Sequence, residues 1–182
     1  MQYKGYRIPV VLLSLAITVT LLAGVALLSE YTLVRLPLIR TLQGIEGVQE
    51  VRLERGAKGD VILVRLASVA DLRKTYGQLY QKALSYEKSA AFSLRLLDNR
   101  DQALEKTYYR LNFSLQEALA TGQFSRLRDE LDRLDQTLDR AQAEIDGDYV
   151  YLQLHQGQNY LYEVVPRQAQ VGSQVSKGGL WP

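Results

Sequence analysis

The pattern of hydrophobic and polar positions divides the chain into an apolar N-terminal stretch and a longer part of mixed polarity. Residues 8–28 carry no charge, and only single Pro, Ser, Thr and Gly residues interrupt the aliphatic ones. A helix of this length covers about 30 Å, which matches the hydrocarbon core of a bilayer. The sequence therefore predicts a transmembrane helix over residues 8–29, with the lipid bilayer as the partner of residues 8–28.

A cleaved signal peptide is the alternative interpretation of this stretch. Its apolar run is longer than the roughly 7–15 residues of a signal peptide, and Gly24-Val25-Ala26 is a poor cleavage site, so a retained anchor is favoured. Lys4 and Arg7 precede the stretch without any acidic residue. The positive-inside rule then predicts a cytoplasmic tail over residues 1–7 and an extracytoplasmic remainder. The expected location is the cell membrane, in a single pass.

Residues 30–98 are predicted to form a small α-β-β-α-β unit. A helix is expected to start near Pro37 and to end between Gly44 and Gly47, because Pro favours the first turn and Gly the end of a helix. The β-branched runs "VQEVRLER" and "DVILVRL" flank a "GAKG" connection of hairpin length. "SVADLRKTYGQLYQKAL" has apolar residues at helical spacing, and the alternation in "AAFSLRLLD" favours a strand over a helix extension.

Residues 99–166 are predicted to form a helical hairpin followed by a β-hairpin. Apolar residues from Phe124 to Ile145 recur at spacings of three and four, which fits either a coiled-coil seam between chains or an αα-hairpin. The short Thr121-Gly122 turn favours the αα-hairpin. "DYVYLQLHQGQNYLYEVVP" alternates around a Gly turn and predicts the C-terminal β-hairpin, and residues 167–182 are expected to be a disordered tail. The predicted fold class is α+β.

Charge and cysteine content narrow the function classes. Lys4 and Arg7 precede every acid, so removing them from the 22 basic residues leaves 20, equal to the 20 acidic ones. A balanced surface of this kind argues against nucleic acid as a partner, which would require a basic face. The chain has no cysteine, which excludes disulfides and thiolate metal sites.

The stretch "GIEGVQEVRLE" resembles the heavy-metal-associated ferredoxin-like domains, in which a helix ends and a strand begins with this Gly-Val spacing. Those domains bind metal through a Cys-x-x-Cys loop, which this chain lacks, so the metal function does not carry over. In element order, residues 33–97 resemble the ring-building motifs of secretion-system and sporulation-channel proteins and, more loosely, BON-type modules. This resemblance implies a role in protein interaction or in building oligomers, without catalytic residues.

Candidate chemistry is sparse. His155 is the single histidine, and with no cysteine the common zinc and nucleophile-base sets are excluded, so we expect no catalytic residue, no metal and no cofactor. Tyrosines gather in the C-terminal hairpin, where they could stabilise the sheet or form an interface. The possible interface residues are Tyr149, Tyr151, Tyr160 and Tyr162, together with the seam leucines Leu127, Leu131, Leu134 and Leu138.

These features predict a non-enzymatic protein-interaction or assembly domain, with a protein partner or a second copy of the chain. The alternative is a sensor or ligand-binding domain. An apolar pocket with convergent polar groups would favour the ligand interpretation, and a filled core with an exposed apolar patch would favour the interaction domain.

Overall fold

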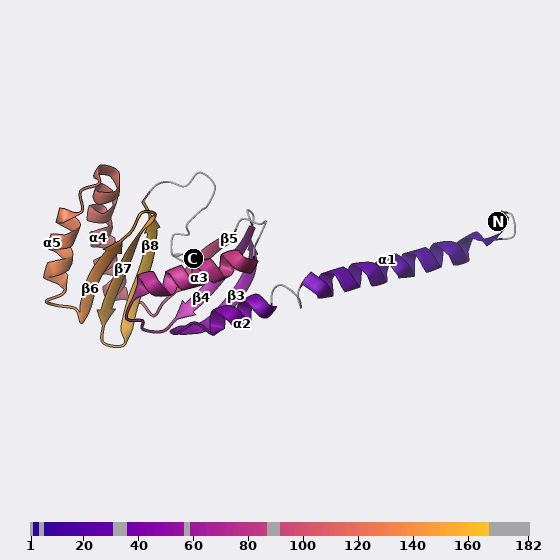
Figure 1. Ribbon diagram of the computed structural model, residues 1–182, viewed down its shortest axis with the longest axis horizontal. Coiled ribbons are helices and arrows are strands. Elements are labelled where there is room, and N and C mark those ends of the chain that lie inside the picture. The colour runs from indigo at the N-terminus through magenta and orange to yellow at the C-terminus, as the bar shows by residue number, and fades with distance from the viewer. Residues whose placement is uncertain (1, 4–5, 31–35, 57–58, 87–91, 168–182) are drawn as a thin grey trace. The chain divides into compact units, whose positions relative to one another are not determined.

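The computed structural model describes residues 2–3, 6–30, 36–56, 59–86 and 92–167 (Figure 1). The chain divides into two compact units, Met1–Arg40 and Thr41–Pro182. The predicted disordered tail lies outside the described residues apart from Arg167.

The N-terminal unit contains one long helix. Strands β1 (Gln2–Tyr3) and β2 (Tyr6–Arg7) pair antiparallel, and α1 (Ile8–Glu30) follows. Within the described part of the chain, no helix reaches the length and apolarity required to cross a membrane. This finding contradicts the predicted transmembrane helix over residues 8–29. It also contradicts the predicted single-pass membrane location with a cytoplasmic N-terminus.

The first sheet belongs to a run of elements in the order helix, strand, strand, helix, strand: α2 (Leu36–Gln43), β3 (Val48–Gly56), β4 (Gly59–Leu66), α3 (Leu72–Tyr86) and β5 (Phe92–Leu97). The strands lie in the order β3-β4-β5. β3 and β4 pair antiparallel as a hairpin, whereas β4 and β5 are parallel and therefore need the crossover that α3 supplies.

Burial follows the periodicity of each of these elements. In β4, Ile62, Val64 and Leu66 are buried on one face of the sheet, as a period of two requires. In α3, the side chains at helical spacing are buried: Leu72, Tyr76, Leu79 and Ala83. Asp71 precedes α3, and its carboxylate caps the helix by accepting a hydrogen bond from the Lys74 N–H at 2.7 Å.

The second sheet follows α4 (Gln102–Thr121) and α5 (Ser125–Leu134) and consists of β6 (Arg140–Ile145), β7 (Tyr149–Gln156) and β8 (Asn159–Pro166). The three strands are antiparallel in the order β6-β7-β8. Asp101 caps the start of α4, where its carboxylate accepts the Leu104 N–H at 2.8 Å, and Gly122 caps its end in the left-handed conformation.

The continuous helical seam expected from Phe124 to Ile145 is wrong beyond Leu134, where α5 ends. Residues 140–145 form β6 and pair with β7. The sequence of this segment fits two patterns. Ala141, Ala143 and Ile145 alternate with polar residues, as in a strand, and Leu138, Ala141 and Ile145 are spaced by three and four, as in a helix. The neighbouring strand decides between the two, because pairing satisfies the backbone groups of this segment.

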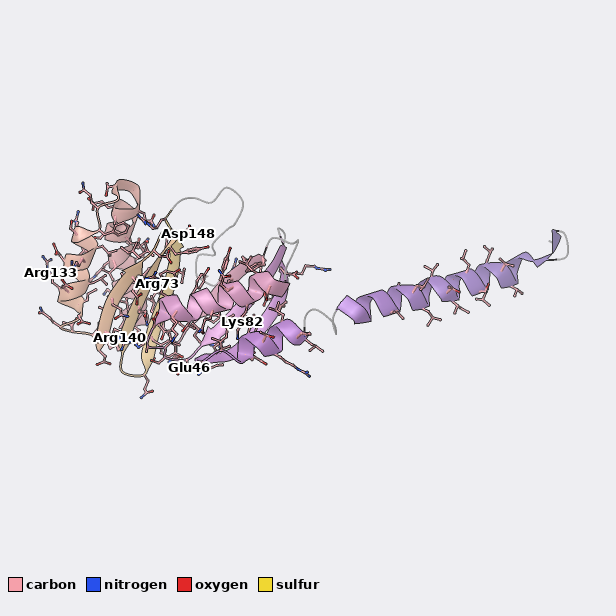
Figure 2. All side chains as sticks on the ribbon, viewed as in Figure 1. Glu46, Arg73, Lys82, Arg133, Arg140 and Asp148 are labelled. Carbon is pink, nitrogen blue, oxygen red and sulfur yellow. The ribbon has the colours of Figure 1, made fainter. Side chains whose placement is uncertain are left out.

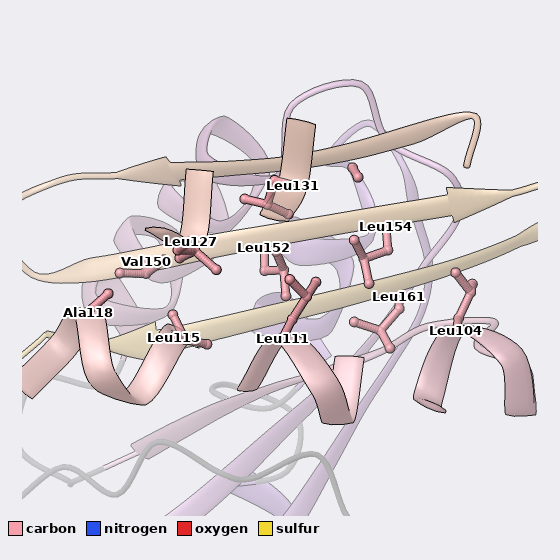
Figure 3. Packing of buried hydrophobic residues seen from close by; sticks show 11 residues of the cluster. Leu104, Leu111, Leu115, Ala118, Leu127, Leu131, Val150, Leu152, Leu154 and Leu161 are labelled. Carbon is pink, nitrogen blue, oxygen red and sulfur yellow. The ribbon is translucent and has the colours of Figure 1, made fainter. Parts of the chain in front are cut away.

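One hydrophobic cluster joins the two helices to the second sheet (Figure 3). α4 and α5 cover one face of the sheet, and the leucines of the expected seam belong to this layer: Leu127 and Leu131 are buried in the cluster, and Leu134 and Leu138 are partly buried against it. The labelled members are Leu104, Leu111, Leu115, Ala118, Leu127, Leu131, Val150, Leu152, Leu154 and Leu161. Consecutive residues of β7 are buried, so both faces of this strand are covered. The face turned away from α4 and α5 therefore packs against a different part of the unit.

Candidate functional site

The other face of the second sheet holds the loop that joins β4 to α3. The Tyr160 hydroxyl donates to the carbonyl of Leu66 at 2.9 Å. The Tyr162 hydroxyl accepts the backbone N–H of Val69 at 2.8 Å. These bonds connect residues more than 90 positions apart, and they tie the two sheets of the Thr41–Pro182 unit together.

Gln153 is the most buried polar residue at this junction, with 2% of its surface exposed. Its side-chain oxygen accepts the N–H of Leu72 at 3.1 Å, and its side-chain nitrogen donates to the carbonyl of Val69 at 3.2 Å. The first N–H groups of a helix have no partner within the helix. Gln153 on β7 of the second sheet accepts one of these N–H groups at the start of α3. Arg140, labelled in Figure 2, adds a bond from its guanidinium to the carbonyl of Ala70 at 3.0 Å.

His155 lies beside this loop. Its Nδ1 is 3.4 Å from the Ser68 hydroxyl, and its buried Nε2 has no hydrogen-bond partner among the described residues. Burial lowers the pKa of His155 below its ordinary value of 6.5; the Arg140 cation lowers this pKa further, and the Asp139 carboxylate opposes both. The imidazole is therefore neutral near pH 7.

The four tyrosines predicted as a possible interface have different surroundings. Tyr149, Tyr151 and Tyr162 are buried, and Tyr160 is half-buried. The ring of Tyr76 on α3 meets the rings of Tyr149 and Tyr151 edge-on at 5.5 and 5.8 Å, an arrangement that stabilises aromatic pairs. Burial raises the pKa of Tyr76 and of Tyr151, so both hydroxyls stay protonated. The interface role of these four residues stays a prediction.

A buried ion network fixes the connection between β5 and α4. The Arg100 guanidinium bonds to the Asp98 carboxylate at 2.7 and 2.8 Å and to the Glu163 carboxylate at 3.0 Å. Asp98 also accepts the backbone N–H of Tyr162 on β8 at 2.8 Å. Burial raises the pKa of Glu163, and the neighbouring Arg100 opposes that shift. Each charge has an oppositely charged partner, and Glu163 on β8 ties the connection to the second sheet, so the network is structural.

Surface depressions in the described part of the Thr41–Pro182 unit include three that differ in their lining. The first, of about 1010 Å³, is lined by the turn at residues 44–47, the loop at residues 68–71 and one side of α3, including Lys74 and Lys82. The second, of about 460 Å³, is polar and includes Arg65 and His155. The third, of about 580 Å³, lies between α5 and β6. Of these, the α5–β6 groove combines an apolar lining with an open sheet edge.

The α5–β6 groove is lined from two elements. α5 and the residue before it contribute Phe124, Ser125, Leu127, Arg128, Leu131 and Asp132, and β6 contributes Ala141, Gln142, Ala143 and Ile145. Small alanines on the strand leave space that Phe124 and the two leucines border on the helical side. Arg128 and Asp132 place one charge of each sign at the rim, one helical turn apart.

β6 is an edge strand among the described strands. The N–H of Asp146 bonds to the carbonyl of Tyr149 at 3.0 Å, and in an antiparallel ladder the residues facing the partner strand alternate. The backbone groups of Ala141, Ala143 and Ile145 therefore point away from β7. The Ala141 N–H confirms this direction, because it bonds to the Asp135 carboxylate at 2.9 Å. Ala143 and Ile145 are left as an open edge beside the groove.

Sequence reasoning missed this site because it treated residues 140–145 as helix. The period-two alternation of that segment was the available signal. Among the described residues, no group of three or more His, Cys, Asp or Glu side chains is placed to hold a metal ion.

The fold and the groove define an α+β unit in which a three-stranded antiparallel sheet leaves one edge strand open beside a helix. No protein-family model, no curated protein and no solved structure matches the chain.

Proposed function

We propose that the Thr41–Pro182 unit is a non-catalytic protein-interaction module that binds an extended segment of a partner protein at the α5–β6 groove. The observation that carries the proposal is the open edge at Ala143 and Ile145 directly beside an apolar lining. An extended peptide that adds to a sheet edge gains affinity from main-chain hydrogen bonds and specificity from its alternate side chains.

The geometry also indicates which segments fit. Side chains of the added strand would alternate between the groove and solvent. Those that enter the groove would meet Phe124, Leu127 and Leu131, so aliphatic or aromatic residues at every second position are favoured. The alternative, a ligand-binding sensor, would be favoured by an enclosed pocket with convergent polar groups. The polar depression at Arg65 and His155 has the polar groups but little apolar lining.

Selection of displayed eight-residue peptides against the chain tests the proposal. We expect enrichment of sequences with apolar residues at alternate positions. Ala143→Pro should weaken their binding at least tenfold, because proline removes the outward N–H while leaving the bonds to β7 in place. The matched control is Ala143→Ser, which keeps the N–H and should bind normally. Ile145→Glu tests the groove independently of the backbone.

Thermal melting must first show that each variant is folded. Peptides that bind Ala143→Pro and the parent chain equally would contradict the proposal, and so would a selection in which no alternating pattern is enriched.

A further inference from the structure

A second surface of the unit carries two exposed aromatic rings. Tyr109 and Phe113 on α4 are 68% and 70% exposed, although the opposite face of the same helix is buried in the cluster. Their rings meet edge-on, with centroids 5.9 Å apart. Tyr and Phe are enriched at protein interfaces relative to the rest of the surface. A phenylalanine that exposes most of its surface is therefore a candidate contact residue.

The charges beside this pair form an ordered pattern. At about 100° per residue, Lys106 and Glu117 lie on one flank of the Tyr109–Phe113 stripe, at opposite ends of the helix. Glu105 and Gln116 lie on the other flank. The Glu117 carboxylate bonds to Arg126 of α5 at 2.8 Å but remains about half exposed, so it can accept a second cation.

We propose that the outer face of α4 binds the same face of a second copy of the chain, with the two helices antiparallel and related by a two-fold axis. In such an isologous contact each residue pair occurs twice. Tyr109 then packs against the partner's Phe113, and Lys106 lies opposite the partner's Glu117. The midpoint of each pair along the helix lies near residue 111, so a single two-fold axis through that point generates both pairs.

The remaining flank is compatible with this arrangement. A two-fold axis across antiparallel helices brings like flanks together, so Glu105 faces the partner's Gln116 and meets no like charge. The charge pattern is thus complementary to itself, which is the reason for choosing a second copy as the occupant over a different protein. This surface lies on α4, away from the α5–β6 groove lining, and the inference does not depend on the proposed function.

Charge-swap variants of the full chain test the arrangement. Fluorescently labelled copies should associate with a concentration-dependent energy-transfer signal. Phe113→Ser should raise the dissociation constant about tenfold or more. Lys106→Glu alone and Glu117→Lys alone should each weaken self-association, because like charges then face each other twice. An equimolar mixture of these two variants should associate like the parent chain, because opposite charges face each other at both positions again.

The matched control for Lys106→Glu is Arg133→Glu on α5, labelled in Figure 2, which changes the net charge by the same amount and should leave association unchanged. All of these side chains are exposed, so the variants should keep the parent melting temperature. Three results would overturn the proposal: a parent chain that is monomeric at all concentrations, a mixture that fails to regain association, or an equal loss with Arg133→Glu. A monomeric parent chain would leave the aromatic pair to a different protein partner.

Discussion

The Gln153 side-chain oxygen accepts the backbone N–H of Leu72 at 3.1 Å, and the two residues are 81 positions apart in the sequence. Gln153 lies on β7 of the second sheet, and Leu72 is the first residue of α3, which belongs with the first sheet. The same side chain donates to the Val69 carbonyl and accepts a bond from Gln142 at 3.0 Å. A single amide therefore holds the β4–α3 loop, the start of α3 and β6 in one arrangement.

Removing this amide should destabilise the unit. Gln153→Ala leaves the Leu72 N–H and the Val69 carbonyl buried without partners, and each unsatisfied buried group costs about 1–3 kcal/mol. We expect a loss of about 2–5 kcal/mol in the free energy of unfolding, measured by urea denaturation. Gln156→Ala, at an exposed position of the same strand, is the control and should change stability by less than about 0.5 kcal/mol. A small effect of Gln153→Ala would mean that water replaces the amide.

His155 should make the stability of the unit depend on pH. Its folded pKa is lowered, chiefly by burial and then by the Arg140 cation. As the pH falls below 6.5, the unfolded chain takes up a proton at His155 before the folded chain does, so stability decreases until the lower folded pKa is passed. Unfolding followed between pH 8 and pH 5 should show this decrease, and His155→Gln should reduce it. Parallel curves for the two proteins would refute the assignment.

The Arg100 network should be sensitive to the loss of its cation. Arg100→Met leaves the carboxylates of Asp98 and Glu163 buried together, with the Asp98 side chain only 3% exposed. Breaking a buried pair in this way costs about 3–5 kcal/mol. Glu163 already has a raised pKa, and losing Arg100 removes the group that opposes that shift. The destabilisation should therefore be larger at pH 7 than at pH 5, where protonation relieves the repulsion.

Glu163→Gln added to Arg100→Met provides the control for the pH effect. The double variant lacks one of the two buried charges, so it should recover part of the lost stability at pH 7 and lose most of the difference between pH 7 and pH 5. If the double variant is as unstable as the single one at both values, the cost comes from lost packing of the arginine stem.

Local patterns were sufficient where a segment fits only one periodicity. The spacing of Leu72, Tyr76 and Leu79 predicted α3, and the structure buries these residues. The pattern was insufficient at residues 140–145, where helical and strand spacings coincide and the pairing partner β7 decides.

The hydrogen-bond partners of single polar residues could not be predicted from the sequence either. Gln153 alternates with apolar residues as a solvent-facing strand position would, yet its partners lie on a loop 81 to 84 residues away. Periodicity shows that a strand has two faces but does not show what covers the second face. The α5–β6 groove was missed for a related reason, since it requires both the end of α5 at Leu134 and the start of β6 at Arg140.

Two glycines with positive φ offer a matched test of the turn that leads into β3. Gly47 (φ 85°) and Gly122 (φ 74°) both adopt the left-handed conformation, which costs a residue with a Cβ about 1–2 kcal/mol. A Cβ at Gly47 would also collide with Cγ1 of the buried Val69, whereas one at Gly122 would meet no atom within 4 Å. Gly47→Ala should therefore lower the unfolding free energy by more than Gly122→Ala, by about 1–3 kcal/mol of overpacking. Val69→Ala added to Gly47→Ala should remove that excess, and an excess that persists in the double variant would show that backbone strain alone distinguishes the two sites.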